Sequence, residues 1–179
     1  MLTIVIPAVE QYDEVNEVFV TSKETKLQLE HSLVSLSKWE AKWFKPFLSK
    51  EKKTMVETVD YIRCMTITQN IDPIIYNFVT NEIIDEVSEY INKSMTATTV
   101  SQRDNIRNRE IITAEIIYYW MIALQIPFEC QKWHLNRLLT LINVCSIKSQ
   151  KPKPMSKQEL MMRYASLNAK RRNLLNSKG

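Results

Sequence analysis

Glycine is nearly missing from this sequence: of 179 residues only Gly179, the last one, is a glycine. Loops that bind nucleotide phosphates need glycines so that backbone N–H groups can approach the phosphate, and tight β-hairpins favour glycine for its positive φ. The lack of an internal glycine therefore argues against nucleotide-dependent enzymes with such loops. A helical chain does without glycine more readily than a β-rich one, so the composition favours helices.

Cysteine and histidine are scarce as well, with three cysteines and two histidines. We interpret Cys64, Cys130 and Cys145 as reduced thiols of a cytosolic protein, because MLTIVIP lacks the basic segment and the long apolar run of a signal peptide. No C-x-x-C spacing is present to form a zinc site, and no family signature surrounds a cysteine–histidine nucleophile. The sequence therefore predicts no catalytic residue, no bound metal and no cofactor.

Length and charge predict one compact domain with an appendage. Hydrophobic residues make up 45% of the chain and charged residues 25%, as in ordinary globular proteins. We expect a small β segment over residues 1–30, a helical core domain over 31–147, and a basic linker with a helix over 148–179. The last segment contains nine Lys or Arg and one Glu, a charge of +8, which leaves −4 on the remainder because the total is +4.

The first thirty residues read differently from the rest. The β-branched runs LTIVI and EVFVTS and the alternating KLQLE predict two or three short strands. Beyond them, apolar residues recur at spacings of three and four, the period of a helix. Thr54 with Glu57 forms a capping-box pattern, and Asp72 followed by Pro73 predicts another helix start. Residues 95–108 lack a period and predict an exposed loop, so the fold is expected to be mainly α.

The most apolar stretch runs from Ile111 to Phe128 and is 18 residues long. We expect a buried core helix rather than a membrane span, because Glu115 interrupts the stretch, Pro127 ends it, and a charged side chain is costly in lipid. A buried carboxylate here would be either functional or paired. We favour a structural role for Glu115, with Arg107, Arg109 or a tyrosine hydroxyl as its partner.

Side chains that could react or bind a metal ion gather in the segment ECQKWHLNRLLTLINVC. On one continuous helix, Cys130 and His134 would share a face, but Cys145 would lie about 16 Å farther along the axis. These three side chains therefore cannot hold one metal ion. We interpret the segment as a packing helix with a leucine-rich stripe, with His134 at its edge and Trp133 stacked on Arg137.

The basic segment after residue 148 has two parts. KSQKPKPM is a proline-containing linker, and Ser156 with Glu159 forms a second capping-box pattern before a basic amphipathic helix. Docking on a protein partner or on the chain's own domain suits this helix best, whereas nucleic-acid binding is a weaker interpretation and membrane binding is not favoured. The residues predicted to bind a partner are Lys157, Leu160, Met161, Arg163, Tyr164, Leu167, Lys170, Arg171 and Arg172.

Several stretches together carry a family resemblance. They are LEHSLVSLSKWEAKWFKPFLSKEKKT, DYIRCMTIT, REIITAEIIYYWMIALQIPFECQKWHLNRLLTLINVC and KPMSKQELMMRYASLNAKRRNLLNSKG. The chain, from about Gln28 to Gly179, resembles small bacteriophage proteins of the tail-gene region. The group is similar to the tail assembly chaperones of long-tailed, non-contractile (siphovirus-type) phages.

The resemblance implies a non-enzymatic role in virion morphogenesis. Tail assembly chaperones bind the tape measure protein, a long helical chain with apolar stripes, and keep it soluble while tail tube protein polymerises around it. A short form and a frameshifted longer form are often made in that family, and this chain would be the short form. The resemblance also implies action in the host cytoplasm and contact with tail tube protein. An acidic body with a basic arm favours a homo-oligomer, formed head to tail along a filamentous client.

Two other functions remain open from the sequence. A virion structural component of the tail or the head–tail connector would use the basic C-terminal arm to bind its neighbours. A helical nucleic-acid-binding protein would use the same charges on phosphates. A chaperone should be absent from the mature particle, whereas a structural component should be present in it.

Overall fold

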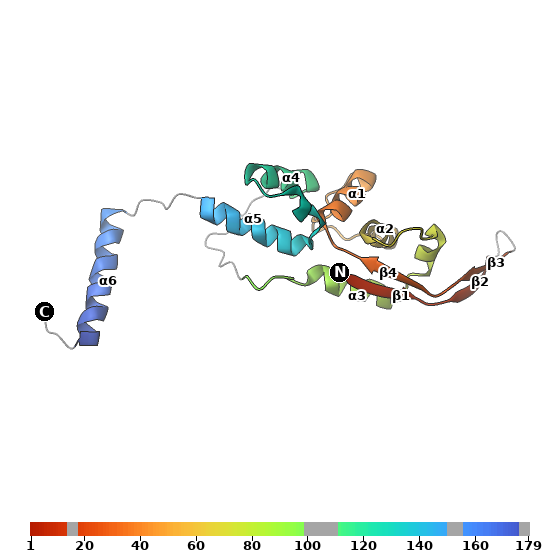
Figure 1. Ribbon diagram of the computed structural model, residues 1–179, viewed down its shortest axis with the longest axis horizontal. Coiled ribbons are helices and arrows are strands. Elements are labelled where there is room, and N and C mark those ends of the chain that lie inside the picture. The colour runs from red at the N-terminus through yellow and green to blue at the C-terminus, as the bar shows by residue number, and fades with distance from the viewer. Residues whose placement is uncertain (14–17, 99–110, 150–155, 176–179) are drawn as a thin grey trace. The chain divides into compact units, whose positions relative to one another are not determined.

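The computed structural model describes residues 1–13, 18–98, 111–149 and 156–175. The chain divides into two compact units, Met1–Ile147 and Lys148–Gly179. It is mainly helical, with strands only near the N-terminus among the described residues and one helix in the second unit (Figure 1). The predicted fold class is thereby confirmed. The predicted loop over residues 95–108 lies mostly outside the described residues.

The strands form one N-terminal antiparallel ribbon. They are β1 (Leu2–Ile6), β2 (Val9–Asp13), β3 (Val18–Ser22) and β4 (Thr25–Leu29). β1 pairs with β4, from Leu2 opposite Leu29 to Ile6 opposite Thr25, and β2 pairs with β3 beyond them. Alternation along β1 and β4 buries one face of this pair, which carries Ile4, Ile6, Leu27 and Leu29.

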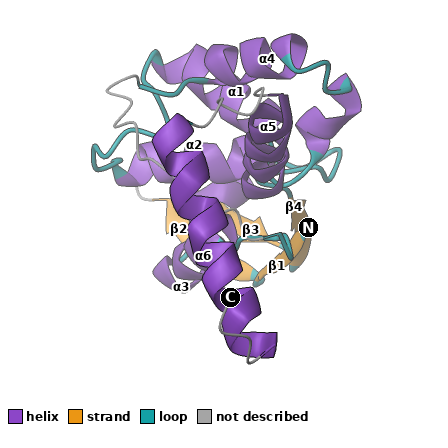
Figure 2. Cartoon of the chain, turned by 90° about the vertical axis from the view of Figure 1, so that its left-hand side faces the viewer, coloured by secondary structure: helices purple, strands orange, loops and turns teal. Residues whose placement is uncertain are grey.

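The helices follow the ribbon in chain order. In the first unit they are α1 (Leu33–Trp43), α2 (Met55–Met65), the 3-10 helix η1 (Pro73–Phe78), α3 (Asn81–Asn92), α4 (Ala114–Ala123), the 3-10 helix η2 (Phe128–Lys132) and α5 (Leu135–Ser149), and α6 (Lys157–Leu175) follows. Figure 1 shows α3 beside β1, and Figures 1 and 2 show α1 and α4 farther from the β1–β4 pair. None of the described helices is long and apolar enough to cross a membrane.

Helix starts agree with the local sequence signals. Thr54 and Glu57 form a capping box at the start of α2, which confirms that prediction. The Asp72 carboxylate accepts from the Ile74 N–H at 3.0 Å, with Pro73 at the first position, so the predicted helix start is also confirmed. The element that follows is a single 3-10 stretch, because the chain turns extended at Val79 before the next helix.

Aromatic rings fill the centre of the core. Phe47 and Tyr61 stack at 3.8 Å between ring centroids, and Trp39 meets Phe47 edge-on at 5.1 Å. The Trp39 indole donates to the Glu57 backbone oxygen at 2.9 Å, which ties α1 to α2. Each fully buried side chain of this size contributes about 1.5–3 kcal/mol relative to exposure.

The chain after α2 is held against the ribbon. The Glu30 N–H donates to the Met65 oxygen at 3.0 Å, and the Ile67 N–H donates to the Gln28 oxygen at 2.8 Å. These bonds pair one edge of β4, so the C-terminal end of α2 has a fixed place beside the ribbon. The position of η1, which begins a few residues later, follows from this anchor.

The segment around His134 departs from the prediction. A continuous packing helix from Glu129 to Cys145 is wrong, because η2 ends at Lys132 and α5 begins only at Leu135. His134 forms an antiparallel bridge with Ser32, and the Leu135 N–H donates to the His31 oxygen at 2.7 Å. Backbone groups that pair with another segment are not available for a helix at the same place.

The apolar stretch is also shorter as a helix than its composition suggests. α4 has 10 residues and ends before Gln125, which has a positive φ of 53°. Glu115 is exposed on α4, so the expectation of a buried carboxylate is wrong. Its proposed partners Arg107 and Arg109 lie outside the described residues.

Candidate functional site

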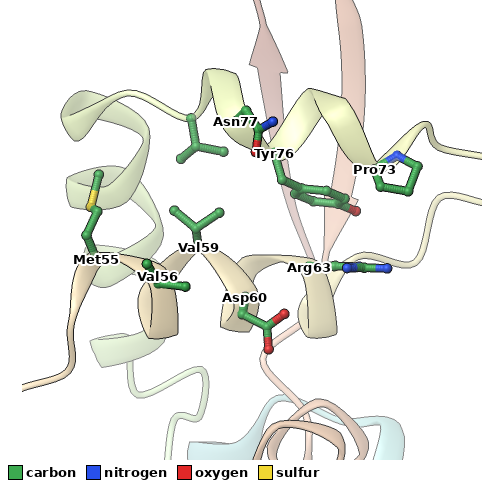
Figure 3. A pocket seen from close by; sticks show the side chains of 9 residues that line it. Met55, Val56, Val59, Asp60, Arg63, Pro73, Tyr76 and Asn77 are labelled. Carbon is green, nitrogen blue, oxygen red and sulfur yellow. The ribbon is translucent and has the colours of Figure 1, made fainter. Parts of the chain in front are cut away.

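A hollow lies between α2 and η1, with a cavity volume of about 340 Å³. Figure 3 shows side chains from both helices turned toward it. Its lining consists of Met55, Val56, Val59, Asp60, Arg63, Pro73, Tyr76, Asn77 and Val79. Most of these side chains are apolar, and the charged pair lies toward the C-terminal part of α2. We call this lining the α2 groove.

Helical spacing places the groove residues on one stripe of α2. Val56, Val59 and Arg63 follow one another at intervals of three and four, so they share a face. Met55 and Val56 are 51% and 68% exposed, although both are apolar. Tyr76 is buried and forms one wall of the groove. Its hydroxyl donates a hydrogen bond to Thr66 Oγ1 at 2.9 Å. The groove is therefore an open apolar surface beside a buried aromatic side chain.

A second hollow borders α2 on its other flank, between α2 and α1. It has a volume of about 400 Å³ and is lined by Lys38, Lys42, Asp60, Arg63 and Cys64. Asp60 and Arg63 line both hollows, so the two lie next to each other on either side of these residues. The second hollow is the basic end of the α2 groove.

Asp60 is already occupied by its neighbours. Its carboxylate forms an ion pair with Lys42 and accepts from the Trp43 indole N–H at 2.9 Å. Among the described residues, no ion pair involves Lys38 or Arg63, and both are exposed. The basic end therefore presents uncompensated positive charge.

Cys64 lies half-buried in the basic end. Burial raises the pKa of its thiol, and the nearby Asp60 carboxylate raises it further, while Lys42, Lys38 and Arg63 act in the opposite direction. The raised pKa keeps this thiol protonated at neutral pH, and the thiolate is the reactive form. Its place in the groove is that of a small, weakly polar wall residue.

His134 and Cys130 take separate places in the structure. Cys130 is buried in η2, whereas His134 lies with its ring centroid 5.1 Å from that of His31 and 5.0 Å from that of Tyr90. The expected position of His134 at the edge of a helical stripe is wrong, because this residue is buried before the helix begins. Within the described part of the chain, no group of three His, Cys, Asp or Glu side chains is placed to hold a metal ion.

The two histidines form a buried neutral pair. Burial, with the neighbouring His134, lowers the pKa of His31 to about 3, and burial also lowers the pKa of His134. His134 Nδ1 accepts from the Asn136 N–H at 3.3 Å, which leaves Nε2 to donate to the Tyr90 oxygen at 3.2 Å. Both rings therefore join the ribbon, α2 and α3 to the start of α5 as uncharged packing groups.

Glu40 is a buried polar residue that sequence reasoning missed. Its Oε1 accepts from the Phe47 N–H at 2.8 Å and its Oε2 from the Ala114 N–H at 2.7 Å. The second bond caps α4, whose own N-cap residue Thr113 makes no side-chain cap bond. Burial raises the pKa of Glu40, and the Glu115 charge adds to the rise. No local signal reveals this role, since the two donors are 7 and 74 residues away.

A second exposed apolar surface lies on α4. The helix is apolar on nearly all sides, yet only Ala114, Ile117 and Met121 are buried. Tyr119 and Ile122 are 66% and 62% exposed on its outer side. A helix that is apolar all round is usually covered, and the outer side of α4 is instead an exposed apolar surface. The predicted stacking of Trp133 with Arg137, nearby in the chain, is confirmed at 4.2 Å from guanidinium to ring.

All the predicted partner-binding residues lie on α6. Helical geometry places Leu160, Tyr164 and Leu167 on one face, with Arg171 on the same face and Arg163 beside it. Met161 and Arg172 fall on another side of the helix. The apolar and basic residues are thus interleaved on one face instead of lying on opposite faces, and the role of this helix in binding stays a prediction.

Comparison of the chain with protein-family models, curated protein sequences and solved structures finds no match. Function therefore has to be inferred from the surfaces themselves and from the resemblance described above. The α2 groove is the surface best defined by its geometry, because all of its lining residues belong to the described part of the chain.

Proposed function

We propose that this protein is a non-enzymatic assembly chaperone that holds a helical segment of a client protein in the α2 groove. The observation that supports this function is the open apolar lining of the groove, where Met55 and Val56 stay exposed beside buried Tyr76. The resemblance to tail assembly chaperones of siphovirus-type phages names the client as the tape measure protein.

The groove suits recognition by shape. An apolar side chain of a client helix would enter the hollow between α2 and η1, and burying about 100 Å² of apolar surface contributes about 2.5 kcal/mol. Apolar contacts of this kind place few demands on sequence, and the methionine at one rim adapts to different side chains. Weak and adaptable binding fits a long client that presents many similar apolar stripes.

The exposed side of α4 adds to this proposal. Tyr119 and Ile122 present a second apolar surface on the same unit. Two weak sites on one molecule, or several molecules along one client, raise the overall affinity through effective concentration. A chaperone that holds a client and later releases it to tube protein benefits from many weak contacts over one tight contact.

Co-expression with a tape measure protein tests the function. We expect the client to stay soluble and to co-purify with the full chain. Val56→Asp should lower the amount of co-purified client about tenfold, because it places a charge in the apolar hollow. The matched control is Val5→Asp, an exposed valine on the ribbon outside the groove. Failure of the unaltered protein to retain any client would refute the chaperone function.

The composition of mature particles separates the chaperone from a structural component. We expect the protein to be absent from purified particles, because a chaperone leaves as the tube closes around the client. Stoichiometric presence in the particle would instead support the alternative, in which the basic residues of α6 bind neighbouring virion subunits. Mass spectrometry of purified particles distinguishes the two.

A further inference from the structure

We propose that the α2 groove selects an acidic amphipathic helix, with an apolar side chain in its apolar hollow and carboxylates at Lys38 and Arg63. The inference deepens the proposed function, since it treats the groove as the docking site and assigns the chemistry of the segment that docks. The two hollows share Asp60 and Arg63, and they differ in charge: the first is mostly apolar and the second is lined by three cations.

One ligand helix lying along α2 can contact the apolar hollow and also Arg63, which borders the basic end. The two hollows share Asp60 and Arg63, and Arg63 lies seven positions after Val56 on α2. Seven residues of an α-helix span about 10.5 Å, or two turns. A ligand helix lying along α2 would therefore place an apolar side chain over Val56 and a second side chain, two turns away, over the basic end.

The charge of the basic end decides the sign of that second side chain. Lys38, Lys42 and Arg63 face one carboxylate, and that carboxylate is bound to Lys42 and Trp43. An acidic ligand would meet two exposed cations that have no ion-pair partner among the described residues. A basic ligand would be repelled and would compete with Lys42 for Asp60. Electrostatic complementarity of this kind sets partner choice and orientation more than affinity.

The α4 surface provides a contrast within the same unit. Its exposed Tyr119 lies one helical turn from Glu115, whose carboxylate is also exposed. By the same reasoning that surface would not favour an acidic ligand. The selectivity proposed for the α2 groove is therefore a property of its own rim and not of every apolar surface on the protein.

Two synthetic peptides test the selectivity with the full chain. The first is a fluorescein-labelled helical peptide with leucines at helical spacing and glutamates on the flanks, and the second replaces each glutamate by lysine. We expect the acidic peptide to bind at least about tenfold more tightly in fluorescence anisotropy at low salt. This preference should shrink in about 1 M salt, because screening then acts within about 3 Å. Equal binding of the two peptides at low salt would overturn the inference.

Charge reversal locates the site. Lys38→Glu with Arg63→Glu should invert the preference, so that the lysine peptide binds more tightly than the glutamate peptide. The matched control is Lys26→Glu with Lys132→Glu, which changes the net charge equally at two exposed positions outside the groove. A third variant, Lys170→Glu with Arg172→Glu, tests α6. If this α6 variant abolishes acidic-peptide binding and the groove variant does not, the groove assignment is wrong.

Two checks keep the result interpretable. Circular dichroism and the melting temperature establish that the charge-reversed protein is folded. If it is not, Lys38→Met with Arg63→Met replaces it, and this variant should lose the preference for the acidic peptide. Co-purification of the tape measure client separates the two proposals. If the client is retained equally by the unaltered and charge-reversed proteins, the chaperone function stands and the acidic selectivity fails. If neither peptide nor client binds, both fail.

Discussion

His31 shows how one residue makes stability depend on pH. It is buried beside Tyr61, with its Nδ1 2.6 Å from the tyrosine hydroxyl, and its pKa is lowered to about 3 from 6.5. Below pH 6.5 the unfolded chain takes up a proton at this residue and the folded protein does not. The stability contributed by neutral His31 is therefore full above pH 6.5 and is lost as the pH falls toward 3. His134, with a pKa also lowered by burial, acts with the same sign.

We expect the free energy of unfolding to fall by up to about 1.4 kcal/mol per pH unit for each histidine below its ordinary pKa. Urea unfolding at several values from about pH 8 to about pH 5 measures this slope. His31→Leu should be less stable at neutral pH but should show a flatter pH dependence. Glu40, whose pKa is raised, titrates with the opposite sign, but it is present in both proteins and cancels in the comparison. An unchanged slope in His31→Leu would contradict the assignment.

Glu40 stabilises the fold through two buried hydrogen bonds, and their contribution can be tested by substitution. Each of its two carboxylate oxygens accepts from one backbone N–H, and a glutamine can accept with only one of its two terminal atoms. Glu40→Gln should therefore destabilise the protein by about 1–3 kcal/mol, the cost of one buried unsatisfied donor. Urea unfolding measures the change. Glu115→Gln, an exposed position in the first turn of α4, is the control and should change stability by less than about 0.5 kcal/mol.

At the scale of elements, α2 connects the stability of the fold with the proposed site. The Thr54 hydroxyl accepts from the Glu57 N–H at 3.3 Å, and the Glu57 carboxylate accepts from the Thr54 N–H at 2.7 Å. The Lys45 ammonium, 2.7 Å from Glu57, contributes most to lowering the pKa of that carboxyl to about 2. The first turn of α2 is thus held at a charged cap, and this same turn presents the exposed apolar rim of the groove.

Thr54→Ala should reduce stability by about 1 kcal/mol through loss of the cap. It should also weaken binding of the acidic peptide, because fraying of the first turn displaces Met55 and Val56. Thr54→Ser retains the hydroxyl and should restore most of both properties. Urea unfolding and peptide anisotropy on the three proteins provide the measurements. Normal binding by a destabilised Thr54→Ala protein would show that the rim does not depend on the cap.

The same elements show which features a sequence can reveal. The caps at Thr54 and Asp72 were predictable because donor and acceptor lie within three residues of one another. The start of α5 was not, since it depends on the bond from Leu135 to His31, which are distant in the chain. The α2 groove was missed for the same reason, because its lining comes from three separate segments, α1, α2 and η1. The partner-binding residues predicted from the sequence all lie on α6, because the residues of one helix are contiguous in the chain.

At the scale of the whole molecule, the two units carry opposite net charge. The segment from residue 148 onward has a charge of +8 and the remainder has −4, as counted from the sequence. The interleaved basic and apolar face of α6 and the α2 groove are separate candidate contacts on one chain. If both units bind the same client, each contributes to the overall affinity, and loss of either is partly compensated by the other.

We expect both units to contribute to the amount of client that the protein binds. Val56→Asp alone and Lys170→Glu with Arg171→Glu alone should each lower the amount of tape measure client that co-purifies, and the combined protein should retain almost none. Loss caused by the α6 changes should be greatest at low salt, because those charges are exposed and screened. Arg171→Lys preserves the charge and should behave as the unaltered protein. If the α6 changes have no effect at any salt concentration, client binding belongs to the first unit, and the basic helix requires a different partner.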